Sequence, residues 1–100
     1  MHLVSVPPLL AFARKHPASK QALQTWCAEV KKAQWQQPAD IKAQFASASI
    51  LKNRRVVFNI KSNDYRIVVA VAFNTGFVYV KFIGTHLEYD AIDADTIEPD

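Results

Sequence analysis

Three runs rich in β-branched and aromatic residues occupy most of the second half of the 100-residue chain and constrain its fold more than any other feature. They span residues 55–61, 65–73 and 77–83, and residues of these types favour strands. The segments between them, 62–64 and 74–76, have turn-forming composition and are too short for a crossover connection. The runs are therefore predicted to form an antiparallel meander, with the apolar middle run as its central strand.

The first half of the chain has helical rather than strand periodicity. Pro8 can occupy the first turn of a helix that continues to Lys15, and Pro17 ends that helix. A second helix is predicted over residues 18–35, because apolar residues recur at steps of three and four. This stripe consists of Leu23, Trp26, Val30 and Ala33. The predicted fold class is α+β, with two N-terminal helices packed on a small antiparallel β-meander in a single domain over residues 1–100.

Shorter elements complete this prediction. Asp40 is expected to cap a short helical turn, and residues 46–53 are interpreted as a loop. Thr85 is followed three places later by Glu88, which is the spacing of a capping box. A short C-terminal helix is therefore expected to begin at His86.

The N-terminus and the single cysteine bear on the cellular location of the protein. Residues 1–6 could form a short strand or a lead-in. The apolar stretch at 3–13 lacks a basic flank and is broken by Pro7-Pro8, which argues against a signal peptide and a membrane span. Cys27 has no cysteine partner in this chain, and a buried structural role is expected for it. The expected location is cytoplasmic.

The charges are distributed unevenly along the chain. All twelve Lys and Arg fall within residues 1–87 with only three acidic residues, giving a charge of +9. Residues 88–100 hold six acidic residues and no basic one, giving −6, and their last part forms an acidic tail at 93–100. A strongly basic body attracts polyanions such as nucleic acids; a solvated basic surface is the simpler alternative. The tail could fold back on the body or serve solubility.

Pairing the predicted strands brings polar side chains to one end of the sheet. A two-residue loop at 63–64 would pair Lys61 with Arg66, and a three-residue loop at 74–76 would pair Arg66 with Gly84. Arg66, Lys61, Asn59 and His86 are then expected to converge on the sheet face turned away from the helices. The same registers place Phe77, Tyr79 and Lys81 on the helix side, and Val78 and Val80 opposite.

Such a group suits phosphodiester cleavage in RNA, where the substrate's own 2′-OH is the nucleophile. His86 can serve as the acid, and Arg66 can clasp phosphate oxygens. The base is left open between Tyr89, Asp90, Lys61 and positioning of the substrate alone. Each of these residues also has a purely structural interpretation: a helix start for His86, a cross-strand surface charge for Arg66, and packing and solvation for Tyr89 and Asp90. No metal site or cofactor is expected, because the histidines share no ligand spacing.

Three segments resemble the HigB toxins of type II toxin–antitoxin systems, within the RelE-like superfamily: residues 54–61, 63–66 and 84–90. The resemblance implies a RelE-like fold and a ribosome-dependent mRNA endonuclease that needs no metal. It also implies neutralisation by a HigA-type antitoxin with a helix-turn-helix domain. The toxin would then reach operator DNA only through that antitoxin, and no membrane would be involved.

By position, the resemblance places the superfamily's strand arginine at Arg66 and the catalytic basic residue after the last strand at His86. One departure is that RelE has lysines on the strand before the hairpin, where this chain has Val57 and Asn59. Other residues are therefore expected to share the RNA contacts: Lys61, Asn59, Arg54, Arg55 and Lys52. Two further interpretations remain, a non-catalytic basic RNA- or ribosome-binding module, and a protein whose sheet edge docks a partner.

Overall fold

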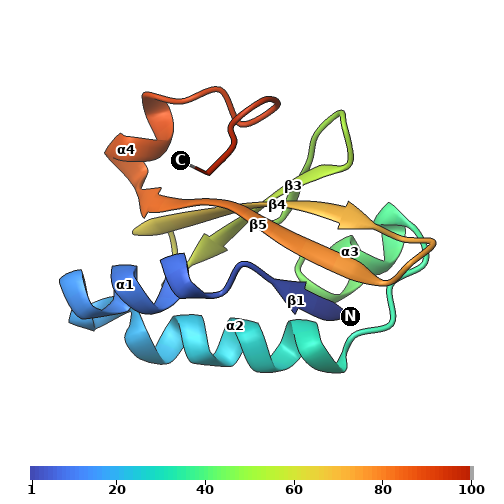
Figure 1. The fold of residues 1–100 in the computed structure, drawn as a ribbon, viewed down its shortest axis with the longest axis horizontal. Helices are drawn as coiled ribbons and strands as arrows, with labels where there is room; N and C mark the ends of the chain where they lie inside the picture. The colour runs from blue at the N-terminus through green and yellow to red at the C-terminus, as the bar shows by residue number, and fades with distance from the viewer. Residues whose placement is uncertain (100) are drawn as a thin grey trace.

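A five-stranded mixed sheet with strand order β1-β5-β4-β3-β2 forms the centre of the computed structural model, which describes residues 1–99 (Figure 1). The strands are β1 (His2–Val4), β2 (Ser49–Ile50), β3 (Arg55–Ile60), β4 (Tyr65–Ala72) and β5 (Phe77–Thr85). The helices are α1 (Pro7–Lys15), α2 (Lys20–Lys32), α3 (Pro38–Gln44) and α4 (His86–Asp90), with a 3-10 turn η1 (Pro17–Ser19). The predicted α+β class, the helices packed on the sheet and the short C-terminal helix are confirmed.

The sheet is larger than the predicted meander. β1 pairs in parallel with β5, with His2 opposite Phe77, so the sheet is mixed rather than antiparallel. β2 pairs with β3, with Ser49 opposite Val57, in a segment that was predicted to be a loop. These edge strands have three and two residues, which is too short for a recognisable period of alternation. The prediction that the middle run is the central strand is confirmed.

Two helix boundaries differ from the predictions. α2 ends at Lys32 because Ala33 is extended, with φ −71° and ψ 154°, whereas the predicted helix continued to residue 35. Trp35 is nevertheless buried in the core. Asp40 lies in the first turn of α3 and is not its cap; its carboxylate accepts a hydrogen bond from the backbone N–H of Gln37, the capping residue, at 3.2 Å.

The turn between β3 and β4 is longer than predicted. Asn59, not Lys61, pairs with Arg66. Lys61 and Ser62 have left the strand for the loop, and their φ angles are +52° and +61°. The register is therefore shifted by two residues, and a shift of two leaves every side chain of the strand on its predicted face.

The pairing of β4 with β5 contains a bulge. Arg66 lies opposite Gly84 as predicted, but the register shifts between Val68 and Val69. Val69 faces Val80 and Val68 faces Phe82, which leaves Lys81 as the extra residue. A β-bulge of this kind gives no periodic sequence signal, because it inserts one residue into an otherwise regular alternation.

The bulge exchanges the faces of the first part of β5. Val78 and Val80 are fully buried in the core that packs against the helices, so their predicted placement on the opposite face is wrong. Lys81 is on that opposite face, where it pairs with Glu98, and its Nζ lies 5.8 Å from the ring centroid of Tyr79. The predicted placement of Lys81 on the helix side is therefore wrong as well.

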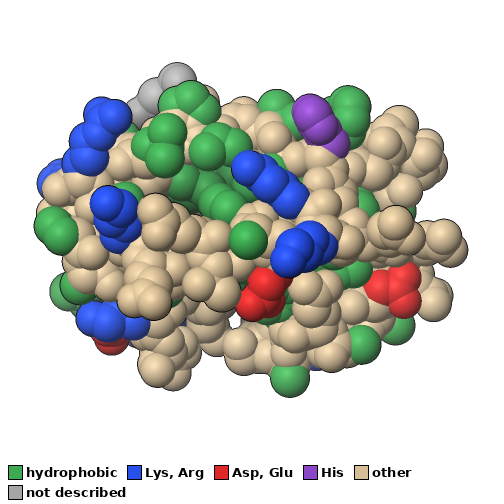
Figure 2. Space-filling model, turned by 90° about the horizontal axis from the view of Figure 1, so that it is seen from below, with side chains coloured by type: hydrophobic (Ala, Val, Ile, Leu, Met, Phe, Trp, Pro, Cys, Tyr) green, Lys and Arg blue, Asp and Glu red, His purple; other side chains and the backbone are tan. Residues whose placement is uncertain are grey.

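Two apolar clusters lie on the two faces of the sheet. The main core fills the space between the helices and the sheet, and its largest fully buried side chains are Phe58, Ile41 and Ile67. Lys and Arg side chains are spread over the outer side of α1 and α2, around exposed apolar areas (Figure 2). The smaller cluster, on the opposite face, joins Val57 and Val68 to Ala94.

The acidic C-terminal segment folds back over the smaller cluster, as Figure 1 shows for the chain beyond α4. Ile92 and Ile97 pack against this cluster. Glu98 pairs with Arg55 at 2.5 Å and with Lys81 at 2.7 Å, and the hydrogen bond from Lys81 holds the pKa of the Glu98 carboxyl below its ordinary value. The first of the two roles considered for the tail is thus observed; Asp100, its last residue, lies outside the described residues.

Candidate active site

His86 is placed by the start of α4. The backbone N–H of Glu88 donates to Oγ1 of Thr85 at 3.2 Å, and the backbone N–H of Thr85 donates to Oε1 of Glu88 at 2.8 Å. This reciprocal capping box fixes the angle at which the chain leaves β5. The same hydrogen bond from the Thr85 backbone lowers the pKa of the Glu88 carboxyl. His86 is therefore the first residue of a short but well-capped helix.

Arg66 joins this group from β4. Its Nη2 lies 3.1 Å from Nδ1 of His86, and its Nη1 donates to the carbonyl oxygen of Asn63 at 2.8 Å. On the other side of the imidazole, Nε2 lies 3.3 Å from Oδ2 of Asp90. Arg66, His86 and Asp90 thus form a continuous row. The predicted strand pairing had placed Arg66 beside His86.

This row determines which nitrogen of the neutral imidazole carries the proton. A guanidinium has only donors, so Nδ1 of His86 accepts from Arg66. The ring proton is then on Nε2, where the Asp90 carboxylate accepts it. The side chains of His86 and Asp90 are 54% and 55% exposed, so a substrate can reach them without any opening of the fold.

Tyr89 lies behind the guanidinium. Its ring centroid is 5.9 Å from Cζ of Arg66, within the range of a cation–π contact. The ring also packs against the smaller apolar cluster. Tyr89 therefore links the position of Arg66 to the smaller apolar cluster.

Asn59 and Lys61 are at the same end of the sheet. Asn59 is paired directly opposite Arg66. Lys61 is exposed in the following loop, with Nζ 3.9 Å from Oδ2 of Asp64. The carbonyl oxygen of Asp64 accepts from the backbone N–H of His86 at 3.2 Å. The loop that carries Lys61 is thus tied to the start of α4.

The other basic residues predicted to bind RNA are not part of this group. Arg55 lies four residues from Asn59 along β3, roughly 13 Å away at the usual rise of a strand. Its guanidinium is buried, donates to the carbonyl oxygen of Ile97 and pairs with Glu98. Arg55 is therefore a structural residue in this fold. Lys52 and Arg54 are exposed at that distant end.

Residues 1–99 offer neither a metal-binding cluster nor a membrane-spanning helix. They contain no group of three or more His, Cys, Asp or Glu side chains that could hold a metal ion. No helix in the same range is long and apolar enough to cross a membrane.

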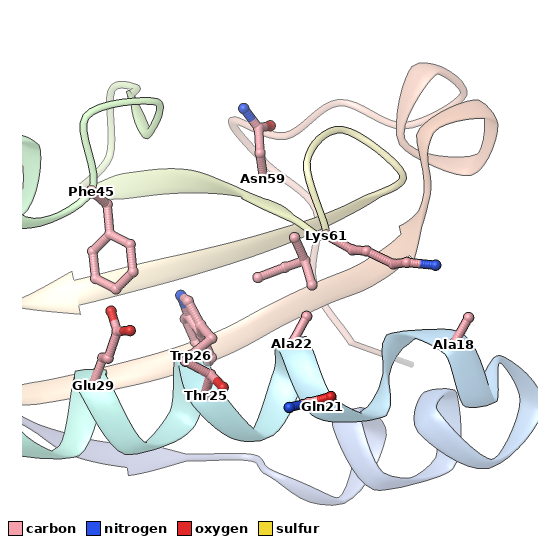
Figure 3. A pocket seen from close by; sticks show the side chains of 10 residues that line it. Ala18, Gln21, Ala22, Thr25, Trp26, Glu29, Phe45, Asn59 and Lys61 are labelled. Atoms are coloured by element: carbon pink, nitrogen blue, oxygen red, sulfur yellow. The ribbon is translucent and has the colours of Figure 1, made fainter.

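One feature near the site was not foreseen from the sequence. A pocket of about 470 Å³ lies between α2 and the end of β3, lined among others by Trp26, Glu29 and Lys61 (Figure 3). Trp26 was interpreted as a core residue, and its side chain is indeed buried. The sequence feature that could have indicated this pocket is Glu29, because it is one of only three acidic residues among the first 87.

Comparison with known proteins gives the family. Residues 19–92 match the HigB toxin family, described as the RelE-like toxic component of a toxin–antitoxin system. The chain is 32% identical over 96 residues to the mRNA interferase toxin HigB of Escherichia coli K12, covering 94% of this chain and 92% of that protein. The mRNA interferase HigB of Shigella flexneri gives the same values. A HigB from Escherichia coli O6:H1 is 28% identical over 92% of the chain. The chain therefore belongs to the HigB toxin family, the RelE-like toxic components of toxin–antitoxin systems.

Proposed function

We propose that this chain is an mRNA interferase that cleaves mRNA on the ribosome by attack of the 2′-OH on the adjacent phosphate. The observation that carries the proposal is the row Arg66–His86–Asp90, with contacts of 3.1 and 3.3 Å and with exposed His86 and Asp90 side chains. Membership of the HigB family supports the same assignment, since the HigB proteins it resembles are named mRNA interferases.

The reaction makes one bond and breaks one. The 2′-oxygen binds to phosphorus, the bond from phosphorus to the 5′-oxygen breaks, and the products end in a 2′,3′-cyclic phosphate and a 5′-OH. Arg66 stabilises the charge that develops on the phosphate oxygens, through a fork that fits two of them. His86 gives its proton to the departing 5′-oxygen.

The contact between Arg66 and His86 couples substrate binding to this acid role. A proton on Nδ1 of His86 would point at the guanidinium, so it requires that Arg66 first turn to another acceptor. The scissile phosphate is that acceptor. Once Arg66 binds the phosphate, Nδ1 is free to hold a proton next to the leaving oxygen, while Asp90 continues to orient the ring through Nε2.

The proton of the 2′-OH has a short list of acceptors. Tyr89, Asp90 and Lys61 are the candidate side chains, and positioning of the 2′-OH by the bound strand is the fourth means. Asp90 already accepts from His86, and we assign it to positioning. Comparing Tyr89→Phe with Lys61→Met separates the two remaining side chains.

The partner we propose is a HigA-type antitoxin with a helix-turn-helix domain, through which alone the toxin reaches operator DNA. The toxin–antitoxin description of the family supports a protein antitoxin. The charge of +9 on residues 1–87 favours binding to ribosomal RNA and mRNA, with an affinity that falls as salt rises.

Expression in growing cells tests the function. His86→Ala and Arg66→Ala are each expected to abolish growth arrest and mRNA loss, while the controls His2→Ala and Arg14→Ala, on exposed residues away from the site, retain both. Ribosome binding without cleavage in the parent protein would favour a non-catalytic binding module. Equal toxicity of all four variants would instead favour docking through another surface, and either result would reject the catalytic assignment.

A further inference from the structure

The pocket between α2 and β3 opens beside an uncovered stretch of strand. β2 pairs only with Val56 and Val57, so among residues 1–99 no strand is paired with the outer side of β3 at Asn59, where the Asn59 side chain donates to the carbonyl oxygen of Ser47 at 3.4 Å. The pocket holds about 470 Å³, enough for a planar ring system. In Figure 3 the α2 side chains form one wall, and Phe45 faces them from the loop after α3.

Trp26 leaves a hydrogen-bond donor without an acceptor. Its side chain is 3% exposed, and its Nε1 has no hydrogen-bond partner among the described residues. Buried donors are almost always paired. The second tryptophan follows that rule, since Nε1 of Trp35 donates to Oε1 of Gln44 at 3.0 Å. Figure 3 shows the Trp26 ring rising from α2 toward the sheet, with its nitrogen at the upper end of the side chain.

Glu29 supplies an acceptor in the lining of the same pocket. It lies three residues beyond Trp26 on α2, a spacing that places both side chains on one face, and both line the pocket. Within residues 1–99 the Glu29 carboxylate has no salt bridge, although the body of the chain is basic. A carboxylate accepts hydrogen bonds from a ligand's donor groups and does not attract its phosphate groups. Glu29 would therefore contribute selectivity and not general affinity for nucleic acid.

We propose that this pocket binds one unstacked purine of the mRNA, an inference that rests on the proposed function. Every RNA base presents a donor beside an acceptor on its Watson–Crick edge, matching Glu29 and the Trp26 N–H, so the preference for a purine comes from the larger ring face. Its large ring face stacks on an aromatic side chain, the usual way in which single-stranded RNA is read. The indole nitrogen is shielded from solvent, so the base reaches it as the half-buried Phe45 ring moves and stacks on it.

The pocket is close enough to the active site to read a base near the cleaved bond. Asn59 lines the pocket and is paired opposite Arg66, and paired strands are roughly 5 Å apart. A strand whose phosphate is bound by Arg66 can therefore cross the edge of β3 and place a neighbouring base against α2. Lys61, exposed at the rim, then contacts the phosphate between the two nucleotides.

Nuclear magnetic resonance of the two indole N–H groups tests the proposal directly. Purified protein is titrated with AMP, GMP, CMP and UMP. Because a purine stacks over a larger ring face, the Trp26 signal is expected to shift with AMP or GMP at concentrations about tenfold lower than with CMP or UMP, while the Trp35 signal, already hydrogen-bonded, stays in place. Glu29→Ala is expected to weaken purine binding about tenfold, and Gln24→Ala, on the exposed side of α2, is expected to leave it unchanged.

Two results would overturn the proposal. One is a Trp26 signal that does not respond to any nucleotide at millimolar concentration, or that responds equally to all four in both the parent and Glu29→Ala. The other is a Trp26 signal that responds only to the antitoxin, which would make the pocket a protein-docking site. mRNA cleavage by the same samples keeps the cases apart, because cleavage with an unresponsive Trp26 rejects the pocket and retains the proposed function.

Discussion

Nη2 of Arg66 lies 3.1 Å from Nδ1 of His86, and the two residues come from different segments, β4 and the start of α4. Because arginine only donates, this contact fixes which nitrogen of His86 is unprotonated in the neutral ring. A phosphate that binds the guanidinium must therefore draw it away from the imidazole of His86. The contact is thus a structural link between phosphate binding and proton transfer.

Arg66→Ala is expected to lower the rate of mRNA cleavage about 100- to 1,000-fold, the usual effect of removing a group that stabilises developing charge. Arg66→Lys is expected to recover only part of this rate, since an ammonium cannot clasp two oxygens. Cleavage of a reporter mRNA in a purified translation reaction measures both, with Arg14→Ala as the matched control. A lysine variant as fast as the parent would contradict the role of the fork.

Asp90→Ala is expected to slow cleavage about 100-fold by releasing the His86 ring, less than the loss caused by His86→Ala. Asp90→Asn retains an oxygen that accepts from Nε2 of His86, so it is expected to recover most of the activity. The pH–rate profile is the decisive measurement: the Ala variant should change the profile, and a merely structural role for Asp90 would leave its shape unaltered.

Gly84→Ala is expected to destabilise the fold by about 1–3 kcal/mol, as overpacking usually does. A Cβ at this position would lie 2.5 Å from Cζ of Phe82 and 3.1 Å from Cβ of Glu88, so it would also displace the start of α4 and with it His86. Urea unfolding and cleavage should both respond. The double variant Gly84→Ala/Phe82→Leu, which removes the closest contact, should recover part of the stability; no recovery would place the strain elsewhere.

The capping box of α4 should make stability depend on pH in the acid range. The pKa of Glu88 is lowered in the folded chain, so its contribution is present above the ordinary value of 4.5 and is lost as pH falls through the lower folded value. The free energy of unfolding of the parent should therefore exceed that of Glu88→Ala at pH 6, and the difference should shrink below pH 4.5. A difference that is constant with pH would assign the effect of Glu88 to packing.

The folded-back tail is expected to stabilise the sheet through Arg55. Arg55→Ala should cost about 1–3 kcal/mol, because its guanidinium is buried and its partners lose a charged hydrogen bond. Glu98→Gln should also lower the melting temperature, whereas Thr96→Ala, exposed on the same segment, should not. Thermal unfolding of the three variants tests this prediction. An Arg55→Ala variant with the melting temperature of the parent would show that the tail packs through its apolar residues alone.

The sequence predicted the elements with long periodic patterns and missed those set by single residues. The two N-terminal helices, the three long strands and the capped helix at His86 all have a strong local signal. The bulge at Lys81 is set by packing: it turns Val78 and Val80 into the main core, and no local pattern distinguishes it from regular alternation. The edge strands β1 and β2 depend on pairing with β5 and β3.

The pairing of Arg66 with Gly84 was predicted from a three-residue loop at 74–76, and it placed Arg66 beside His86. In the structure Ala72 lies opposite Phe77, so the loop has one residue more, and the bulge at Lys81 restores the predicted register at Arg66. The burial of Arg55 and its pairing with Glu98 were not predicted, because the sequence does not reveal that the tail covers this residue. The pocket at Trp26 was not visible either, because a helical stripe does not show which of its members also faces an opening.

The chemistry of the RNA ends tests the central claim most directly. A reporter mRNA is incubated with ribosomes and the purified protein, and the ends of its fragments are mapped. We expect 2′,3′-cyclic phosphate and 5′-OH ends with the parent protein, and a loss of about 1,000-fold or more in their formation with His86→Ala, while His2→Ala cleaves normally. Fragments with 5′-phosphate ends, or equal cleavage by His86→Ala, would contradict cleavage by the 2′-OH with His86 as the acid.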